Sequence, residues 1–454
     1  MKTIWAEKAL TTEGWAAGVR IDLGADGRIE TITCDAGAEG YKAGILLPAP
    51  ANLHSHSFQR AMAGMTEARG PDAHDSFWTW RALMYHFLDH LQPDDLEAIA
   101  AFAQMEMLEA GYAAVAEFHY VHHQPGGAPY DDVAELSNRI ASAASETGIG
   151  LTLLPVLYEQ GGCDGRPLEG GQLRFANNAE NFSRLYESAA ATIAGLPGDS
   201  RLGFAGHSLR AVSREGLTRS LSLAPKGPIH IHIAEQQAEV DEVKMAWGRR
   251  PVEWLFDNHD VDQRWCLVHA IQMEPHETKA LAGSGAVAGL CPVTESNLGD
   301  GVFDGAHYFE NNGRFGVGTD SNVRISLAEE LRMLEYTQRL QEQARAVLAT
   351  PETSTGRFLL EGAARGGAQA AGRNSGVIEV GRFADFIALD RNAINLFDKE
   401  EDAILDSYIF AGDDRLITDV WSAGRHVVTD GRHIKRDAIT ARYRSVLETL
   451  KARI

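Results

Sequence analysis

The chain has 454 residues, more than one ordinary domain needs and enough for a barrel of about 250 residues with a smaller domain beside it. Hydrophobic residues make up 44% of the sequence and charged residues 23%, a balance that excludes an intrinsically disordered protein. The net charge of −21 excludes a general binder of nucleic acid, because such a protein needs a basic surface for the phosphate backbone.

No feature of the sequence indicates a membrane or an oxidising compartment. The N-terminal residues MKTIWAEKAL lack the apolar core of a signal peptide, and no apolar stretch approaches the length of a membrane span. The four cysteines are widely spaced without a C-x-x-C pair, so they predict neither a zinc knuckle nor a redox dithiol. We therefore expect a cytoplasmic protein that has no nucleic-acid partner and no membrane partner.

Short β-like pieces open the chain and return at its end. Residues 1–46 contain TIWAEKAL, GVRIDLG and RIETITC, with Gly and Asp turns between them. Residues 372–454 contain VIEVGRFADFIALD and DVWSAGRHVVTDGRHI, which are again rich in β-forming residues. We expect these two segments to fold together into one small β-sandwich domain, and residues 47–371 to form the larger domain.

Eight short apolar segments recur in the middle of the chain, most of them separated by helical patterns. They are residues 44–56, 113–120, 150–159, 201–208, 228–235, 264–270, 286–294 and 314–321. Apolar runs bounded by Gly or Pro are typical of parallel strands that are buried on both faces. Strand and helix that alternate eight times predict an α/β fold, specifically a (β/α)8 TIM barrel.

Nearly every predicted strand is apolar until its last positions, where a group capable of chemistry follows. These groups are His54, His56, His119, Tyr120, Tyr158, His207, His232, His269 and Asp320. Catalytic groups of such barrels lie at the C-terminal ends of the strands. The pattern therefore predicts that these residues surround one mouth of the barrel.

Four of these residues are the predicted metal ligands. His54 and His56 alternate by two at a strand end, so both imidazoles point to the same side, although an H-x-H pair alone is a weak signal. His232 and Asp320 complete a set of three imidazoles and one carboxylate, which suits zinc or iron(II) better than magnesium or calcium. No lysine closes a predicted strand to bridge a second ion. We expect one Zn²⁺ per chain, with Fe²⁺ as the alternative.

Residues near these ligands are the predicted acid and base groups. Glu235 is the main candidate, because a carboxylate beside an activated water can carry its proton to a leaving nitrogen; a helix cap or a salt bridge is its other interpretation. His269 would orient the water or be a buried structural histidine, and Asp320 would share the proton handling. His230 shares a face with His232, but it lies farther from the strand end, so we expect a core histidine there.

The motifs HSH (54–56), HIAE (232–235), LVHA (267–270) and GTDS (318–321) resemble those of the amidohydrolase superfamily, in its mononuclear deaminase branch. The resemblance covers almost the whole chain. It implies the same four metal ligands, with Glu235 as the proton shuttle and His269 as the water-orienting group. It also implies a homodimer.

Longer segments resemble the formimidoylglutamate deiminase family. They are NLHSHSFQRAMAGMTE (52–67), DSFWTWR (75–81), EFHYVHH (117–123) and GHSLRAVS (206–213). This resemblance implies metal-dependent hydrolysis of N-formimino-L-glutamate to N-formyl-L-glutamate and ammonia, a step of histidine degradation.

Such a substrate is a small molecule with two carboxylates, so its pocket needs cations and hydrogen-bond donors. Arg81 and Arg210 are the predicted carboxylate-binding residues, because a guanidinium holds a carboxylate through two parallel hydrogen bonds. Gln59, Tyr120 and His207 are predicted to donate further hydrogen bonds. The alternative for the two arginines is a surface position on a loop, and the alternative for Gln59 is a helix cap.

Two other functions stay open at this point. One is another reaction of the same branch, such as guanine deamination or triazine hydrolysis, which would use the same metal residues with a different pocket. The other is a barrel without catalytic activity that serves assembly or regulation. Within the first interpretation, formiminoglutamate and formiminoaspartate differ by one methylene, a discrimination of about 1–3 kcal/mol that residue types do not decide.

Overall fold

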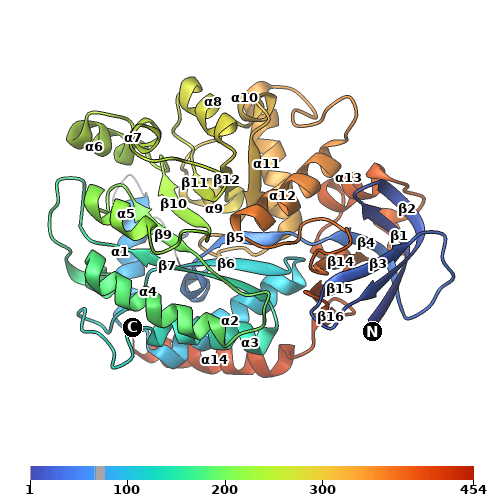
Figure 1. Ribbon diagram of the computed structural model, residues 1–454, viewed down its shortest axis with the longest axis horizontal. Coiled ribbons are helices and arrows are strands. Elements are labelled where there is room, and N and C mark those ends of the chain that lie inside the picture. The colour runs from blue at the N-terminus through green and yellow to red at the C-terminus, as the bar shows by residue number, and fades with distance from the viewer. Residues whose placement is uncertain (1, 66, 68–76, 454) are drawn as a thin grey trace.

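The computed structural model describes residues 2–65, 67 and 77–453, and its strands form two sheets. Parallel strands form a barrel in the middle of the molecule, and a separate mixed sheet lies at one side of it (Figure 1). The predicted fold, an α/β barrel with a small β domain built from both ends of the chain, is confirmed. In the described ranges, no helix is long and apolar enough to cross a membrane.

The eight barrel strands are hydrogen-bonded in chain order, each parallel to the next. They are β5 (Ala51–Ser55), β6 (Ala114–His119), β7 (Gly150–Leu157), β9 (Phe204–Ser208), β10 (Ile229–Ile233), β11 (Trp265–His269), β12 (Val287–Leu290) and β13 (Arg314–Val317). The short β8 (Arg201–Leu202) pairs with β7. All eight lie within the predicted apolar segments. Parallel strands that are buried on both faces can be recognised in a sequence as apolar runs between turn residues.

Two of the predicted segments also include part of an element outside the barrel sheet, and a proline accounts for each difference. Residues 44–48 belong to β4 (Tyr41–Pro48) of the other sheet, and β5 begins only after Pro50. Residues 292–294 begin a helix after β12, with Pro292 at its first position. Proline lacks the N–H that a strand ladder needs, and it is favoured in the first turn of a helix.

Helices and short 3₁₀ turns connect the barrel strands and surround them. They are η1 (Ser57–Met62), α1 (Phe77–Leu88), α2 (Pro93–Glu109), α3 (Glu135–Thr147), η2 (Gly170–Arg174), α4 (Ala179–Ala194), α5 (Arg214–Leu221), α6 (Gln237–Trp247), α7 (Pro251–Asn258), α8 (Pro275–Ser284), α9 (Pro292–Leu298), α10 (Gly305–Glu310), α11 (Leu327–Glu342) and α12 (Thr355–Ala370). In Figure 1 the helices lie outside the strands, which leaves both faces of the barrel sheet buried.

The barrel closes between β5 and the residues that follow β13. The backbone N–H of His56 donates to the carbonyl oxygen of Asp320 at 2.9 Å, and the N–H of Asp320 donates to the carbonyl oxygen of His54 at 2.9 Å. The buried side chain of Asn52 adds two hydrogen bonds to Thr319, at 2.7 and 3.1 Å. Three predicted metal ligands are thus held together by the backbone hydrogen bonds that complete the barrel.

Helix α12 lies directly against the two closing strands. A Cβ atom on Gly366 would lie 1.7 Å from the carbonyl oxygen of Phe315, and one on Gly367 would lie 2.6 Å from that of Ala51. Only glycine permits so close an approach of two backbones. The adjacent glycines of this helix therefore set its distance from β5 and β13.

The second sheet takes strands from both ends of the chain. Its order is β17 (Arg432–His433), β16 (Arg425–Thr429), β15 (Ile417–Ser422), β14 (Phe386–Leu389), β4, β1 (Lys2–Thr11), β2 (Gly14–Leu23) and β3 (Ile29–Thr33). Side chains alternate between its faces: Leu46 and Phe386 join a small core of the sheet's own, whereas Leu47 and Ile387 join the main core with the barrel. This alternation attaches the small sheet to the barrel.

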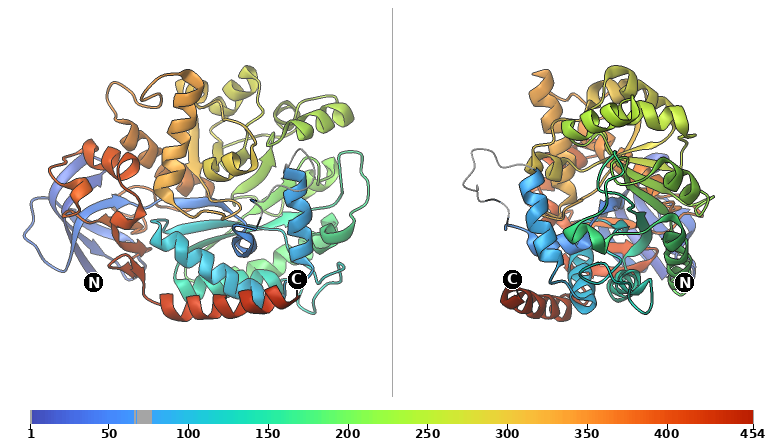
Figure 2. Two further views of the ribbon diagram at one scale, coloured as in Figure 1. Left: turned by 180° about the vertical axis from the view of Figure 1, so that it is seen from behind. Right: turned by 90° about the vertical axis from the view of Figure 1, so that its left-hand side faces the viewer.

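The end of the chain returns to the barrel. After η3 (Ile394–Leu396), α13 (Asp402–Phe410), η4 (Asp414–Leu416) and the last strands, helix α14 (Arg436–Arg453) runs along α2 (Figure 2). Its Tyr443 ring stacks on Phe102 of α2 with 3.9 Å between the ring centroids.

Candidate metal centre and active site

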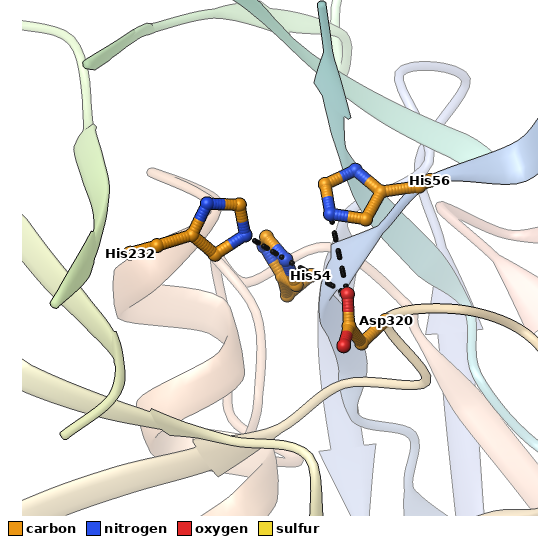
Figure 3. Close-up of side chains that lie close together, drawn as sticks. All are labelled: His54, His56, His232 and Asp320. Atoms are coloured by element: carbon orange, nitrogen blue, oxygen red, sulfur yellow. Dashed lines mark hydrogen bonds and ion pairs between the residues drawn. The ribbon is translucent and has the colours of Figure 1, made fainter. Parts of the chain in front are cut away.

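Four buried side chains at the closing edge of the barrel form the metal group, a set of side chains that can hold a metal ion. Their ligand atoms all lie within 4.8 Å of one another: His54, His56, His232 and Asp320. Oδ1 of Asp320 lies 3.3 Å from Nε2 of His54 and 3.2 Å from Nε2 of His56. Figure 3 shows the four groups converging, with the ring of His232 directed at His54, where the two Nε2 atoms are 3.0 Å apart.

Backbone carbonyl groups orient two of the imidazoles. Nδ1 of His56 donates to the carbonyl oxygen of Phe118 at 3.0 Å, and Nδ1 of His232 donates to that of His207 at 2.9 Å. A neutral ring in either position carries its proton on Nδ1 and presents the lone pair of Nε2 to the centre of the group. Metal-binding histidines commonly have this second hydrogen bond, so the donor set fits a divalent metal ion.

The ionisation of these groups also suits a metal. Burial lowers the pKa of His54 to about 3 and holds that of His232 well below its usual range, so both rings are neutral at pH 7. Burial alone would raise the pKa of Asp320, but the hydrogen bonds with His54 and His56 outweigh it and keep the carboxyl ionised. Neutral imidazoles and an ionised carboxylate are ligands in the form that zinc requires.

His230 lies outside this group, although it is only two residues from His232 on β10. Its Nε2 donates to the carbonyl oxygen of Ala370 at 2.8 Å, and the ring is fully buried in the core. The structure thus groups His232, and not His230, with the other predicted ligands, and the binding of a metal by this group stays a prediction.

Two further predicted residues lie next to the metal group. Nε2 of His269 is 3.9 Å from Oε1 of Glu235 and 4.0 Å from Oδ2 of Asp320. Burial raises the pKa of Glu235. Burial lowers the pKa of His269, but the surrounding carboxylates, chiefly Glu235 and Glu295, raise it to about 10. A metal ion beside Asp320 would lower the pKa of His269 again, because the positive charge of the ion repels an imidazolium.

The backbone at this mouth of the barrel is strained. Ala234, His269, Ala270 and Asp320 have φ angles of 50°, 69°, 51° and 42° although none of them is glycine. A left-handed conformation of this kind costs roughly 1–3 kcal/mol per residue, and it concentrates at sites where side-chain direction matters.

A pocket opens above the metal group, and it collects nearly all of the predicted site residues. It is lined by His56, Gln59, Trp80, Arg81, Met84, Tyr120, His207, Arg210, His232, Glu235, His269, Leu298 and Asp320. The five predicted substrate-binding residues are among them, so Arg81 and Arg210 lie at this pocket. Their roles toward a substrate stay predictions, and the geometry shows only that they share one pocket with Glu235 and His269.

Hydrogen bonds between neighbours hold several of these side chains in place. Nε2 of Gln59 donates to the Tyr120 hydroxyl at 2.8 Å. Nη2 of Arg81 donates to the Tyr158 hydroxyl at 2.8 Å, and its Nε donates to the Tyr85 hydroxyl at 2.6 Å. These two hydrogen bonds hold the guanidinium of Arg81 at the pocket.

Sequence reasoning missed two carboxyl groups beside the pocket, Glu295 and Asp300. Nδ1 of His269 lies 3.2 Å from Oε1 of Glu295. Burial and the charge of Glu235 raise the pKa of Asp300 to about 9. Both residues follow β12, the one predicted strand to which the sequence pattern assigned no chemical group. That gap in an otherwise regular pattern is the signal that could have located them.

The barrel and its buried metal group place this protein in the class of metal-dependent barrel hydrolases. Residues 45–427 match the model of the amidohydrolase family, and residues 1–42 match the N-terminal domain of the formimidoylglutamate deiminase HutF. The chain therefore belongs to the amidohydrolase family, and within it to the formimidoylglutamate deiminases.

Individual relatives agree with this placement. The chain is 50% identical to a formimidoylglutamate deiminase of Pseudomonas aeruginosa, over 99% of this chain and 100% of the relative. A crystal structure of an amidohydrolase from Brucella melitensis has a TM-score of 0.95 and 45% identity, covering 99% of this chain and 100% of the other. A zinc-bound adenosine deaminase from Xanthomonas campestris has a TM-score of 0.82 at 20% identity, covering 99% and 98% of the two chains, and shares the fold.

Proposed function

We propose that this protein hydrolyses N-formimino-L-glutamate to N-formyl-L-glutamate and ammonia, with one Zn²⁺ per chain. The observation that carries the proposal is the single pocket that joins the metal group and Glu235 to Arg81 and Arg210. The name of the Pseudomonas aeruginosa relative supports the substrate, since half of its residues are identical over nearly the whole chain. This reaction is a step of histidine degradation.

The donor set supports zinc as the metal. Three imidazole nitrogens and one carboxylate favour zinc or iron(II) over magnesium or calcium, which prefer oxygen ligands. The ion would supply a water of lowered pKa at neutral pH and would polarise the formimino group. His54, His56, His232 and Asp320 would hold it, and the pocket beside His56 and His232 leaves room for water and substrate.

The residues of the pocket then perform distinct tasks. Glu235 accepts the proton of the attacking water, which adds to the formimino carbon to give a tetrahedral centre. Glu235 next delivers that proton to the imino nitrogen, which becomes an amino group. The hydroxyl proton of the tetrahedral centre then passes to the same nitrogen through Asp320 and Glu235, and ammonia leaves as its C–N bond breaks and the C=O bond of the formyl group forms. His269 orients the water, since its Nε2 lies close to both Glu235 and Asp320.

The two arginines account for the choice of an anionic substrate. The protein has a net charge of −21, so a dianion reaches the pocket only if the pocket itself is locally basic. Arg81 and Arg210 would each hold one carboxylate, with Gln59, Tyr120 and His207 as further donors. A neutral ring substrate, such as guanine, has no carboxylate for either guanidinium to hold.

Replacing Arg210 with alanine is expected to raise KM for N-formimino-L-glutamate at least about thirtyfold and to leave the metal content unchanged. Loss of one partner of a desolvated charge pair costs about 2 kcal/mol or more, which corresponds to that factor. Steady-state kinetics and metal analysis measure the two effects. Arg214→Ala is the matched control, since Arg214 stacks on Trp247 and is not among the described residues that line the pocket. Unchanged KM in Arg210→Ala would contradict the assignment.

The reaction itself is tested by following the zinc-loaded protein and N-formimino-L-glutamate by NMR. Formation of N-formyl-L-glutamate with ammonia is the expected result. Glutamate with formamide would keep the metal site but reverse the assignment of the broken bond. No reaction by protein that contains metal would overturn the substrate. N-formimino-L-aspartate and guanine, run in parallel, test the reach of the pocket and the ring alternative.

A further inference from the structure

A buried carboxylate stands behind His269, on the side away from the pocket. Glu295 lies in the first turns of α9, only 4% of its surface is exposed, and it is not among the described residues that line the pocket. Its Oε1 accepts hydrogen bonds from Nδ1 of His269 at 3.2 Å and from the backbone N–H of Cys291 at 2.9 Å. Glu295 therefore contacts one face of a pocket residue without reaching the pocket.

The opposite nitrogen of the same ring faces the reacting centre. Nε2 of His269 lies 3.9 Å from Glu235 and 4.0 Å from Asp320, where the substrate and water would meet. An imidazole has two nitrogens, and the hydrogen bond of one decides whether the other presents a proton or a lone pair. A carboxylate on Nδ1 keeps a proton there in either charge state of the ring, so Nε2 is the nitrogen that faces the pocket.

Backbone strain at His269 is a separate observation that supports a defined direction of this ring. His269 and Ala270 both have positive φ angles, and the N–H of Ala270 is tied back to Ile233 at 3.0 Å. Such a conformation persists only where the surrounding structure enforces it. Helix α9, which carries Glu295, is in turn tied to the loop of Asp320, because the Thr294 hydroxyl lies 3.0 Å from that of Ser321.

We propose that Glu295 is a positioning residue for the hydrolysis: it holds the proton of His269 on Nδ1 and directs Nε2 of that ring at the water beside Glu235 and Asp320. The inference rests on the proposed function, because His269 acts there on the attacking water. Glu295 itself touches neither substrate nor metal ligand, so it should govern the rate of the chemical step and leave substrate binding unaffected.

The alternative is a purely structural role, in which Glu295 only stabilises the start of α9 by accepting the N–H of Cys291. Glu330 offers a matched control, since its buried carboxylate accepts the N–H of Val293 at 3.0 Å in the same turn of α9. Removal of either carboxylate takes one acceptor from this turn, but only removal of Glu295 affects His269. Glu330→Ala should therefore lower stability without a specific loss of kcat.

The test compares Glu295→Ala, Glu295→Gln and Glu330→Ala in the zinc-loaded protein. Loss of the group that orients a functional histidine typically costs 10–100-fold in activity. We expect Glu295→Ala to lower kcat per bound metal by about that factor with KM and metal content unchanged. Glu295→Gln keeps an acceptor oxygen for Nδ1–H, so it should recover most of the lost kcat. Glu330→Ala should keep kcat within about twofold.

A readout that does not need turnover is the Nδ1–H signal of His269 in ¹⁵N-histidine NMR, identified by its loss in His269→Ala. The signal should be present in the wild-type protein, shifted in Glu295→Ala and unchanged in Glu330→Ala. Equal kcat losses in Glu295→Ala and Glu330→Ala, or an unshifted signal, would overturn the proposal. Failure of the wild type to act on N-formimino-L-glutamate would count against the proposed function, while the NMR signal would still decide the contact.

The same side chains allow one competing arrangement. Ligand atoms of His269, Cys291 and Glu295 lie within 4.8 Å of one another, close enough for a second metal ion. Oε1 of Glu295 already accepts two hydrogens there, which argues for a hydrogen-bonded pair instead. Two equivalents of zinc per chain, with one of them absent in Cys291→Ser, would overturn the positioning role.

Discussion

Removal of the metal is expected to lower kcat for N-formimino-L-glutamate at least about a thousandfold, and added Zn²⁺ is expected to restore it. A metal ion contributes several kcal/mol to a hydrolytic transition state, and about 4 kcal/mol corresponds to a thousandfold in rate. Without the ion, the pocket has no Lewis acid that lowers the pKa of water. Assay after chelation with dipicolinate, followed by stepwise addition of zinc, measures the effect.

Stability should change together with activity. An ion that binds only the folded chain stabilises it by about 4 kcal/mol when its free concentration is a thousand times Kd, so chelation should lower Tm. The pair His232→Ala and His230→Ala separates the metal group from the core around it. His232→Ala should lose metal and activity, whereas His230→Ala, which loses a hydrogen bond to Ala370, should lose stability but keep its zinc. Equal zinc loss in both variants would contradict the assignment of the ligands.

Glu235→Gln is expected to lower kcat at least about a hundredfold while the metal content stays unchanged. A glutamine at position 235 would have the same size as the glutamate, but its amide does not accept the proton of the attacking water. Glu242→Gln is a control on the neighbouring helix α6, because Glu242 pairs with Arg166 and is not among the described residues that line the pocket. It should keep kcat within about twofold. Retained turnover in Glu235→Gln would assign the proton transfer to another group.

The pH profile gives a second measurement of the same residue. Glu235 must be ionised to accept a proton, so activity falls as the pH drops through its pKa. Burial raises this pKa above the usual 4.5, so the acid limb of kcat/KM should lie above that pH. The residual activity of Glu235→Gln should lack this limb. An identical limb in wild type and variant would show that a different group titrates.

Much of the site could be predicted because parallel strands of a barrel share one direction. Every strand ends at the same mouth, so a chemical group at the end of a strand is near the others whatever the loops do. His54 and His56 also follow the two-residue period of a strand, which places both rings on one side. These relations hold within a few residues of the chain, and they need no knowledge of how distant segments pack.

Choices between near-equivalent side chains needed the packed structure. His230 and His232 share one face of β10, and only their distance from the strand end favours His232 in the sequence. The carbonyl oxygen of Ala370, 140 residues away, is the contact that holds His230 in the core. Arg81 likewise donates a hydrogen bond to the hydroxyl of Tyr158, 77 residues along the chain. Contacts over such separations depend on loop paths that residue periodicity does not encode.

The sequence by itself determined the barrel, the small domain formed from both chain ends, and the metal group. The spacing of apolar residues and the polar groups at strand ends can both be recognised within a short stretch of sequence. The tertiary structure decided how the barrel closes, with Asp320 hydrogen-bonded through its backbone to His54 and His56. It also decided which carboxylate supports His269: Glu295 is 26 residues away and lies in a helix that begins where a strand had been predicted. Such pairings come from the packing of separate βα units, which no single segment specifies.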